Sequence, residues 1–245
     1  MPTGRVVVVG AGPGAADLIT LRGAHWLARA DVVLYDALTD PALREHAPKA
    51  TWIHVGKRGY ADDSTGQHEI NALLVEHARS GALVVRLKGG DPSVFGRLEE
   101  ELIALEAAGI ECEVVPGVTA AIAAAAATLR PLTRRGSGRS VAFATAVTAT
   151  TSAGELRHAA DTEVYYMAGK QLAGLSARLL AAGWPADTPA CVVSRAGWPD
   201  MRASEHRVDG LDAAARIHAG RPTVVSVGAG AAPVLRGPVV QPSNE

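Results

Sequence analysis

The chain has 245 residues, of which 48% are hydrophobic and 20% charged, so it can bury a substantial core and is not a disordered tail protein. Its formal net charge of −1 provides no overall field that favours nucleic acid or an anionic membrane surface. The longest apolar run, residues 120–128, is too short to span a bilayer, and the N-terminus lacks the basic region and apolar core of a signal peptide, so we expect a cytoplasmic protein without membrane or nucleic-acid partners.

Strand-like and helix-like segments alternate through the first half of the chain. Residues 5–9 form a β-branched strand that ends at Gly10-Ala11-Gly12-Pro13-Gly14, and an amphipathic segment follows to about residue 30. A second strand over residues 31–35 ends at Asp36. Further on we predict a helix that Gly81 ends, a strand over 84–88, a helix over 99–108, a strand over 110–115 and an alanine-rich helix over 119–128. This alternation predicts an α/β domain with a mainly parallel sheet.

The second half of the chain begins with a change of pattern. Residues 129–138, LRPLTRRGSG, are rich in Pro, Gly and Arg and are the best linker candidate. Beyond them we expect strands near 141–145, 162–167, 190–195, 203–208 and 223–227, and helices near 171–182 and 212–218. More strands than helices favour a mixed sheet. We therefore predict an N-terminal domain over residues 1–130, a C-terminal α/β domain over 131–240 and a tail over 241–245.

The cysteines and histidines give no sign of a disulfide or a metal site. Cys112 and Cys191 lie far apart in apolar, strand-like segments, where small core residues are expected. No histidine lies three or four residues from another, and no Cys-x-x-Cys occurs, so we expect no metal.

Two glycine-rich turns follow predicted strands. Residues 10–15 match the dinucleotide fingerprint G-x-G-x-x-[GA], and Asp36 follows at about the spacing of roughly 20 residues that suits a ribose contact. This match suggests a flavin or nicotinamide enzyme, but any tight strand-to-helix turn selects glycine. The second turn, Gly89-Gly90-Asp91-Pro92, is not explained by that fingerprint. Because the carboxyl ends of parallel strands can flank one crevice, the two turns together indicate a ligand site.

The chain also resembles a known family. The segments GAGPGAADLITLRGAHWLARADVVLYDAL, VGKRG, QHEIN, VVRLKGGDPSVFGR, EVVPGVTAA and RPLTRRG occur in this order and are similar to those of the tetrapyrrole methylase superfamily. The resemblance implies the tetrapyrrole methylase fold, in which two α/β domains bind S-adenosyl-methionine in the cleft between them, and a homodimer. It implies C-methylation of uroporphyrinogen III at C2 and C7, giving precorrin-2 for sirohaem or cobalamin synthesis, with S-adenosyl-homocysteine as the other product.

The resemblance also implies roles for individual residues. Asp36 and Lys57 match positions assigned to proton transfer; the alternatives are a strand-end turn residue and a solvated loop residue. The implied cofactor site comprises Pro13, Gly89, Gly90, Asp91, Val94, Thr119, Ala120, Met167 and Ala196.

Arginine dominates the basic residues, with 20 arginines against 4 lysines. A GC-rich genome explains this skew, and so does recognition of carboxylates, which the guanidinium fork binds bidentately. The tetrapyrrole substrate implied by the resemblance carries several carboxylates. The candidates to bind them are Arg22, Arg58, Arg97, Arg130, Arg134, Arg135 and Arg139.

Several residues depart from the family's usual pattern. They are Ser93, Leu98-Glu99, Arg134, Ala144-Thr145-Ala146 and Ala196. Because most lie in the second domain or along the cleft, they bear more on the substrate than on the cofactor. Two alternatives stay open: a related methylase acting on a later precorrin, another carbon acid or ribosomal RNA, and a flavin- or nicotinamide-binding protein or non-enzymatic nucleotide-binding module. The lack of a net basic charge disfavours RNA.

Overall fold

The computed structural model describes residues 4–56, 66–147 and 158–234. The chain divides into two compact units, unit 1 (Met1–Thr119) and unit 2 (Ala120–Glu245). This division precedes the predicted boundary at residue 130, because helix α4 (Ala120–Ala127) contacts strand β10 (Thr223–Gly228) of unit 2. The predicted linker also folds within unit 2, where Arg134 and Gly138 exchange backbone hydrogen bonds of 2.7 and 3.0 Å.

Unit 1 is built on a parallel sheet. Its five strands have the order β3-β2-β4-β1-β5, and each pair is parallel. The strands are β1 (Arg5–Gly10), β2 (Val32–Tyr35), β3 (Thr51–His54), β4 (Leu83–Lys88) and β5 (Glu111–Val115). Strand β3 and the 3-10 segment η2 (Pro41–His46) before it were not predicted. Both segments are too short to show a clear apolar period in the sequence. Strand β3 forms because it pairs with the edge of β2.

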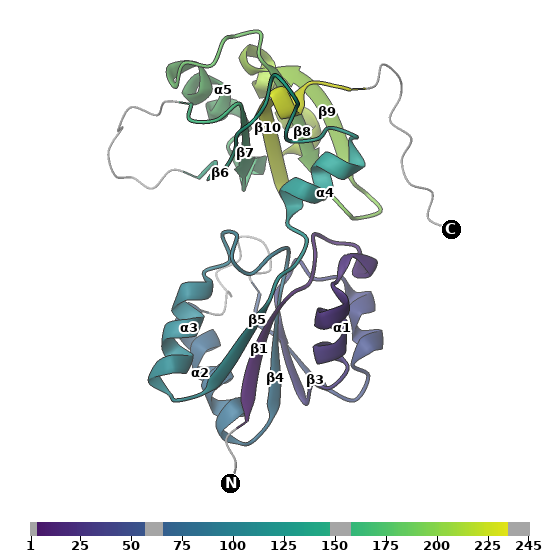
Figure 1. Cartoon of the computed structure of the whole chain (residues 1–245), viewed down its shortest axis with the longest axis vertical. Coiled ribbons are helices and arrows are strands. Elements are labelled where there is room, and N and C mark those ends of the chain that lie inside the picture. Colours follow the sequence, from purple (N-terminus) through teal and green to yellow (C-terminus); the bar gives the residue numbers. More distant parts are fainter. Residues whose placement is uncertain (1–3, 57–65, 148–157, 235–245) are drawn as a thin grey trace. The chain divides into compact units, whose positions relative to one another are not determined.

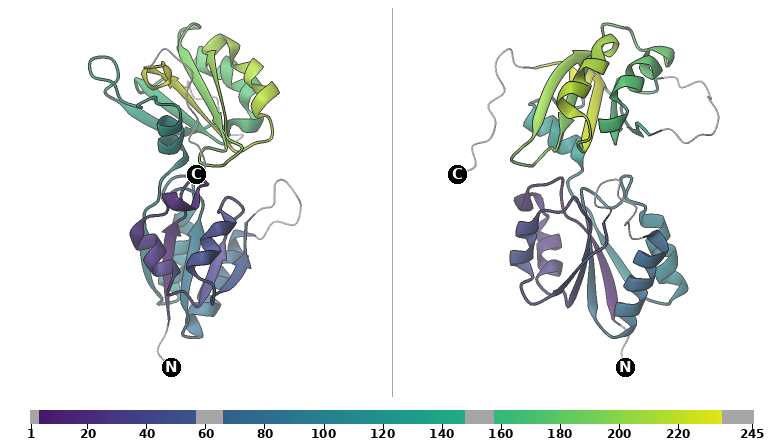
Figure 2. Two further views of the ribbon diagram at one scale, coloured as in Figure 1. Left: turned by 90° about the vertical axis from the view of Figure 1, so that its right-hand side faces the viewer. Right: turned by 180° about the vertical axis from the view of Figure 1, so that it is seen from behind.

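Helices cover both faces of this sheet, as Figures 1 and 2 show. The helices α2 (Gln67–Arg79) and α3 (Leu98–Ala107) lie on one face, and α1 (Leu21–Leu27) lies on the other. Successive residues of β1 point to opposite faces, so Val6 and Val8 pack in the α2–α3 core while Val7 and Val9 pack in the α1 core. A strand buried on both faces needs a continuous apolar run, which is why β1 reads as unbroken valine.

Unit 2 contains a mixed sheet with the order β6-β7-β10-β8-β9. Strands β6 (Val141–Thr145) and β7 (Thr162–Tyr166) are parallel, whereas β10, β8 (Pro189–Ser194) and β9 (Arg202–Arg207) pair antiparallel. Helix α5 (Leu172–Ala181) packs its leucines in a core with Val192, Val225 and Val227. The predicted helix over 212–218 is instead a 3-10 segment, η4 (Val208–Ala214), followed by the short helix α6 (Ala215–His218).

Cys112 and Cys191 are both free, and burial raises the pKa of each thiol, to about 11 for Cys112. Within the described parts of the chain, every helix is too short or too polar to cross a membrane.

Three charged side chains are buried together at the end of β4. Arg86, Lys88 and Glu101 are 4%, 4% and 0% exposed. Glu101 Oε1 lies 3.1 Å from Arg86 Nε and 2.8 Å from Lys88 Nζ, and Glu101 Oε2 has no hydrogen-bond partner among the described residues. Burial, and then the charge of Arg86, lowers the pKa of Lys88, while Glu101 opposes that shift. One carboxylate therefore balances two buried cations directly before Gly89.

We predict that Glu101→Gln lowers the free energy of unfolding by about 3–5 kcal/mol, because it leaves two buried cations without a counter-charge. Urea denaturation measures the change. Glu100→Gln is the matched control, since Glu100 lies one residue away on α3 and forms an exposed ion pair with Arg97. A similar loss in both variants would contradict the role given to the buried cluster.

Candidate functional site

Glycine-rich loops meet at one edge of the unit 1 sheet. Strand β1 lies between β4 and β5, so the carboxyl ends of these parallel strands are neighbours. Gly12 and Gly90 exchange backbone hydrogen bonds, with N–O distances of 3.3 and 2.6 Å. The Gly117 amide, in the loop after β5, donates to Asp91 Oδ2 at 2.9 Å, and the Ser93 amide donates to Asp91 Oδ1 at 2.8 Å. The two turns singled out from the sequence are therefore in direct contact.

The loops approach so closely that side chains are excluded between them. An added Cβ at Gly117 would lie 2.3 Å from Gly90 O and 2.8 Å from Gly10 Cα, and one at Gly10 would lie 2.6 Å from Gly117 Cα. These neighbours are backbone atoms, which cannot rotate away. Gly117 was not among the predicted site residues. The signal that could have found it is a third glycine directly after a predicted strand.

Gly90 has open space on its other side. Its φ of +73° is a conformation that favours glycine, and the nearest atom to an added Cβ is Thr119 Cα at 3.9 Å. Gly89 and Gly90 are partly exposed, and Pro13 and Val94 are as well. This arrangement leaves room at the loop edge for a ligand to reach the backbone. Thr119 ends the loop after β5 and is 8% exposed, and Ala120 is the first residue of α4.

Asp36 is attached to this cluster from the neighbouring strand. It follows β2, and its Oδ2 accepts a hydrogen bond of 3.1 Å from the Gly89 amide, while its Oδ1 accepts one of 3.1 Å from the Leu38 amide. An added Cβ at Gly89 would lie 2.7 Å from Leu38 Cβ, so only glycine allows this contact. Each carboxylate oxygen can accept a further hydrogen bond or a proton. The structure therefore places a usable carboxylate beside the glycine loops.

The geometry of the first turn differs from a dinucleotide site. Such a site aims the N-terminus of a long helix at the pyrophosphate directly after the glycines. Here the glycines lead to the 3-10 segment η1 (Ala16–Leu18), and α1 starts only at Leu21, where Thr20 Oγ1 caps it by accepting from the Gly23 amide. In addition, β1 pairs with β4 and β5 and not with β2. The fingerprint match reflects tight packing of loops.

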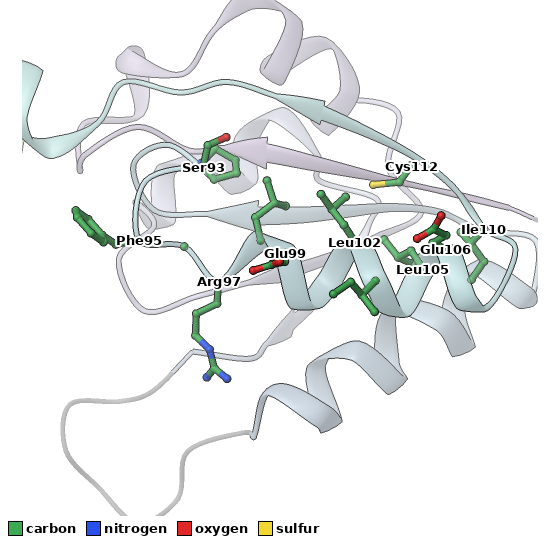
Figure 3. Close-up of a pocket in the computed structure, with 13 residues that line it drawn as sticks. Ser93, Phe95, Arg97, Glu99, Leu102, Leu105, Glu106, Ile110 and Cys112 are labelled. Carbon is green, nitrogen blue, oxygen red and sulfur yellow. The ribbon is translucent and has the colours of Figure 1, made fainter. Parts of the chain in front are cut away.

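Residues 93–97, which follow the second glycine turn, lead to α3. They border a groove whose lining includes Phe95, Leu102 and Cys112. The side chains of Phe95 and Arg97 extend away from α3 (Figure 3). Arg97 Nε and Nη2 each donate to the Glu100 carboxylate at 2.7 Å. Its guanidinium is thus already paired with a carboxylate of its own chain.

The other predicted arginines are in different environments. Arg130 is 4% exposed, and its guanidinium donates to Cys191 Sγ at 3.1 Å and to Glu205. This burial argues against the predicted role of Arg130 in binding substrate carboxylates. Arg134 donates to the backbone carbonyls of Pro131 and Ala232. Arg22, Arg135 and Arg139 have exposed side chains, whereas Lys57 and Arg58 lie outside the described residues.

Two predicted cofactor residues of unit 2 follow β7 and β8, the two strands on either side of β10. Met167 follows β7 with a φ of +57° and is 49% exposed, so it is not a core methionine. Ala196 follows β8 and is 5% exposed. Both strands pair antiparallel with β10, so they run in the same direction and their carboxyl ends lie at the same edge. In the described parts of the chain there is no cluster of three or more His, Cys, Asp or Glu side chains that could hold a metal.

Known proteins resemble this chain over most of its length. The uroporphyrinogen-III C-methyltransferase of Pseudomonas aeruginosa is 45% identical over 203 residues, which cover 82% of each chain. Siroheme synthase 1 of Klebsiella pneumoniae subsp. pneumoniae is 46% identical over 82% of this chain but only 43% of its own length. A crystal structure of uroporphyrin-III C-methyl transferase from Thermus thermophilus complexed with S-adenyl homocysteine matches with a TM-score of 0.78 and 36% identity, over 92% of this chain and 97% of that one.

The two five-stranded sheets and this structural match define a two-unit α/β methylase fold. The chain belongs to the Tetrapyrrole (Corrin/Porphyrin) Methylases, whose family model matches residues 5–212. The fold class and the family predicted from the sequence are therefore confirmed. The chain spans less than half the length of the Klebsiella siroheme synthase that it resembles.

We predict that Gly117→Ala lowers the free energy of unfolding by about 1–3 kcal/mol, because its methyl group overlaps the Gly90 carbonyl and forces the loops apart. Gly66→Ala is the control, since Gly66 has a φ of −67° and nothing within 4 Å of an added Cβ. Urea denaturation of both variants measures the difference. Equal stability of the two would show that the close approach is not required.

Proposed function

We propose that the chain is an S-adenosyl-methionine-dependent methyltransferase that methylates uroporphyrinogen III at C2 and C7 to give precorrin-2. The observation that carries this proposal is the contact between the glycine loops after β1, β4 and β5, with the Asp36 carboxylate bonded to the same cluster. The family membership and the Thermus thermophilus complex with S-adenyl homocysteine support it. The product S-adenosyl-homocysteine would leave the same site.

The residues present fit this cofactor. The open space beside Gly90 would be filled by any side chain, so a ligand can contact the backbone there. Bound S-adenosyl-methionine supplies a methyl group that its sulfonium already activates. We assign its binding in unit 1 to Pro13, Gly89, Gly90, Asp91, Val94 and Thr119. We assign Ala120, Met167 and Ala196 of unit 2 to the same cofactor.

The loops orient the reactants and Asp36 handles the proton. A pyrrole carbon that gains a methyl group must afterwards lose a proton, and a carboxylate within reach can accept it. Asp36 is fixed by the Gly89 and Leu38 amides, so its free acceptor positions have a defined direction. Lys57 is the second residue assigned to proton transfer. The pyrrole carbon is itself the nucleophile, so the protein does not have to supply one. Its binding residues, which follow strand ends, keep the reacting atoms aligned.

Exposed arginines are the best candidates to bind the substrate. Arg22, Arg135 and Arg139 present guanidinium groups that can bind carboxylates bidentately. Arg58, Arg97 and Arg134 are assigned with them, although Arg97 must exchange Glu100 for a substrate carboxylate. A related methylase acting on a later precorrin is the second candidate. The exposed Ser93 and the partly exposed Arg134, both departures from the family pattern, favour it.

Two remaining expectations extend this proposal. The chain forms a homodimer, and it acts in the cytoplasm. In unit 2 the exposed apolar residues Ile122, Leu129 and Phe143 line one groove, which is suited to an interface with a second copy. Sedimentation equilibrium at micromolar concentration tests the dimer, and a monomer at every concentration would contradict it.

The function is tested by incubating the protein with methyl-labelled S-adenosyl-methionine and enzymatically generated uroporphyrinogen III. We expect a doubly labelled product with the absorbance of precorrin-2. Cofactor binding without label transfer would contradict the assigned substrate and favour a later precorrin. A yellow protein that binds NAD tightly would instead support a flavin or nicotinamide protein.

We predict that Asp36→Asn slows turnover by about 100-fold or more, because an amide cannot accept the proton. The affinity for S-adenosyl-homocysteine, measured by calorimetry, is expected to change only a few-fold, since an amide oxygen still accepts one backbone hydrogen bond. Asp40→Asn is the control, because Asp40 caps η2 through the Ala42 amide. Unchanged turnover in Asp36→Asn would remove Asp36 from the mechanism.

A further inference from the structure

We propose that Ser194, whose hydroxyl is bonded to buried His218, is a positioning residue that holds the turn 195–201 through a hydrogen-bond chain. The chain, which we call the serine–histidine chain, consists of His206, Ser204, His218, Ser194 and Arg221. The inference rests on the proposed function, in which Ala196 of this turn contacts the cofactor. None of these residues was among the site residues predicted from the sequence.

The serine–histidine chain is continuous. His218 Nδ1 lies 2.9 Å from Ser194 Oγ, and His218 Nε2 lies 2.8 Å from Ser204 Oγ. Ser204 Oγ lies 2.7 Å from His206 Nε2, and Arg221 Nε donates to Ser194 Oγ at 2.9 Å. His218 and Ser194 are both 0% exposed. Water cannot replace any partner at the centre of this chain.

The hydrogen bonds have one direction in which every group is satisfied. Ser194 Oγ accepts from Arg221, and we assign its own hydrogen to His218 Nδ1, because the described residues offer this hydroxyl no other acceptor. Neutral His218 then carries its hydrogen on Nε2 and donates to Ser204, which donates to His206. Burial first, and then the charges of His206, Arg221 and Arg202, lowers the pKa of His218 to about 4. His218 is therefore neutral at pH 7, as this direction requires.

Arg221, at one end of the serine–histidine chain, bonds directly to the turn 195–201. Arg221 Nη2 donates to both the backbone carbonyl and, at 3.2 Å, the Oδ2 of Asp200. Asp200 Oδ1 in turn accepts from Arg195 Nε at 2.6 Å, and the Arg195 amide donates to Pro222 O at 2.8 Å. Arg195 has a φ of +52°, an unfavourable conformation for a residue with a side chain. The contacts with Asp200 and Pro222 hold this conformation, which sets the direction of Ala196.

The two serines on His218 differ in what they control. Removing the Ser194 hydroxyl takes away the acceptor of Arg221 Nε and the partner of His218 Nδ1, so Arg221, which bonds to Asp200 of the turn, loses its connection to His218. Removing the Ser204 hydroxyl leaves His218 Nε2 without an acceptor but keeps the Ser194–Arg221–Asp200 contacts. Both changes delete one hydroxyl bonded to the same histidine. A purely structural role predicts equal effects, and a positioning role predicts different ones.

The experiment compares Ser194→Ala with Ser204→Ala in the full chain. Hydrogen–deuterium exchange is followed at the amides of Trp198 and Met201, which bond to carbonyls within the turn. In Ser194→Ala we expect exchange to be about tenfold faster and the affinity for S-adenosyl-homocysteine to be about tenfold weaker, the equivalent of one or two lost hydrogen bonds. In Ser204→Ala we expect the exchange rate and the affinity to stay near the wild-type values. The thermal midpoints of the two variants are expected to fall by similar amounts.

Equal exchange and equal affinity in the two variants would overturn the proposal. Faster exchange in Ser194→Ala with unchanged affinity would also overturn it, because the turn would then not serve the cofactor. A wild-type protein that does not bind S-adenosyl-homocysteine contradicts the proposed function instead, while the exchange data still test the turn. If Ser194→Ala does not fold, Ser194→Cys keeps a buried side chain of similar size and leaves Arg221 intact, and because a thiol is a weak donor and acceptor a smaller loss in the same direction is expected.

Discussion

The close approach of the backbones at Gly10, Gly90 and Gly117 is the constraint on which the site in unit 1 depends. Three parallel strands can end at this spacing only if none of the loops carries a side chain between them. The carboxylates then complete the cluster: Asp91 joins the loops after β4 and β5, and Asp36 joins the end of β2 to Gly89. The backbone assigned to the cofactor and the carboxylate assigned to proton transfer are thus parts of one hydrogen-bonded cluster.

Both units place buried polar networks directly behind the turns assigned to the cofactor. In unit 1, Arg86, Lys88 and Glu101 lie at the end of β4 before Gly89. In unit 2, His218 and Ser194 lie at the end of β8 before Ala196. Apolar packing tolerates small shifts, whereas a buried polar group that loses its partner is costly. Such networks therefore hold a turn in one geometry, at a desolvation cost that an apolar core would not have.

Some site residues could be predicted from adjacent residues in the sequence, whereas the environment of others depends on residues far away in the sequence. Gly89, Gly90 and Asp91 were predicted because a buried β-branched strand ends at them, and the structure places them at a strand end in contact with the first glycine turn. Arg130 was selected because it lies in an arginine-rich stretch, yet it is buried against Cys191 and Glu205, which are far from it in sequence. The dinucleotide fingerprint was misleading for a similar reason. Gly10 packs against Gly90 and Gly117 in the loops after β4 and β5, and the glycines are followed by the 3-10 segment η1 and not by a long helix.

Local patterns were sufficient for most strands and helices, for the α/β class and for the glycine turns, because periodicity and backbone freedom are properties of a few adjacent residues. The resemblance to the family depended on the order of such segments. Strand order, the short edge strand β3 and the division at Thr119 depend on pairing between distant segments. The serine–histidine chain is the clearest case, since β8, β9, α6 and Arg221 supply its members. No short stretch of sequence encodes it, because a hydrogen-bond network is defined by distances that only the folded sheet creates.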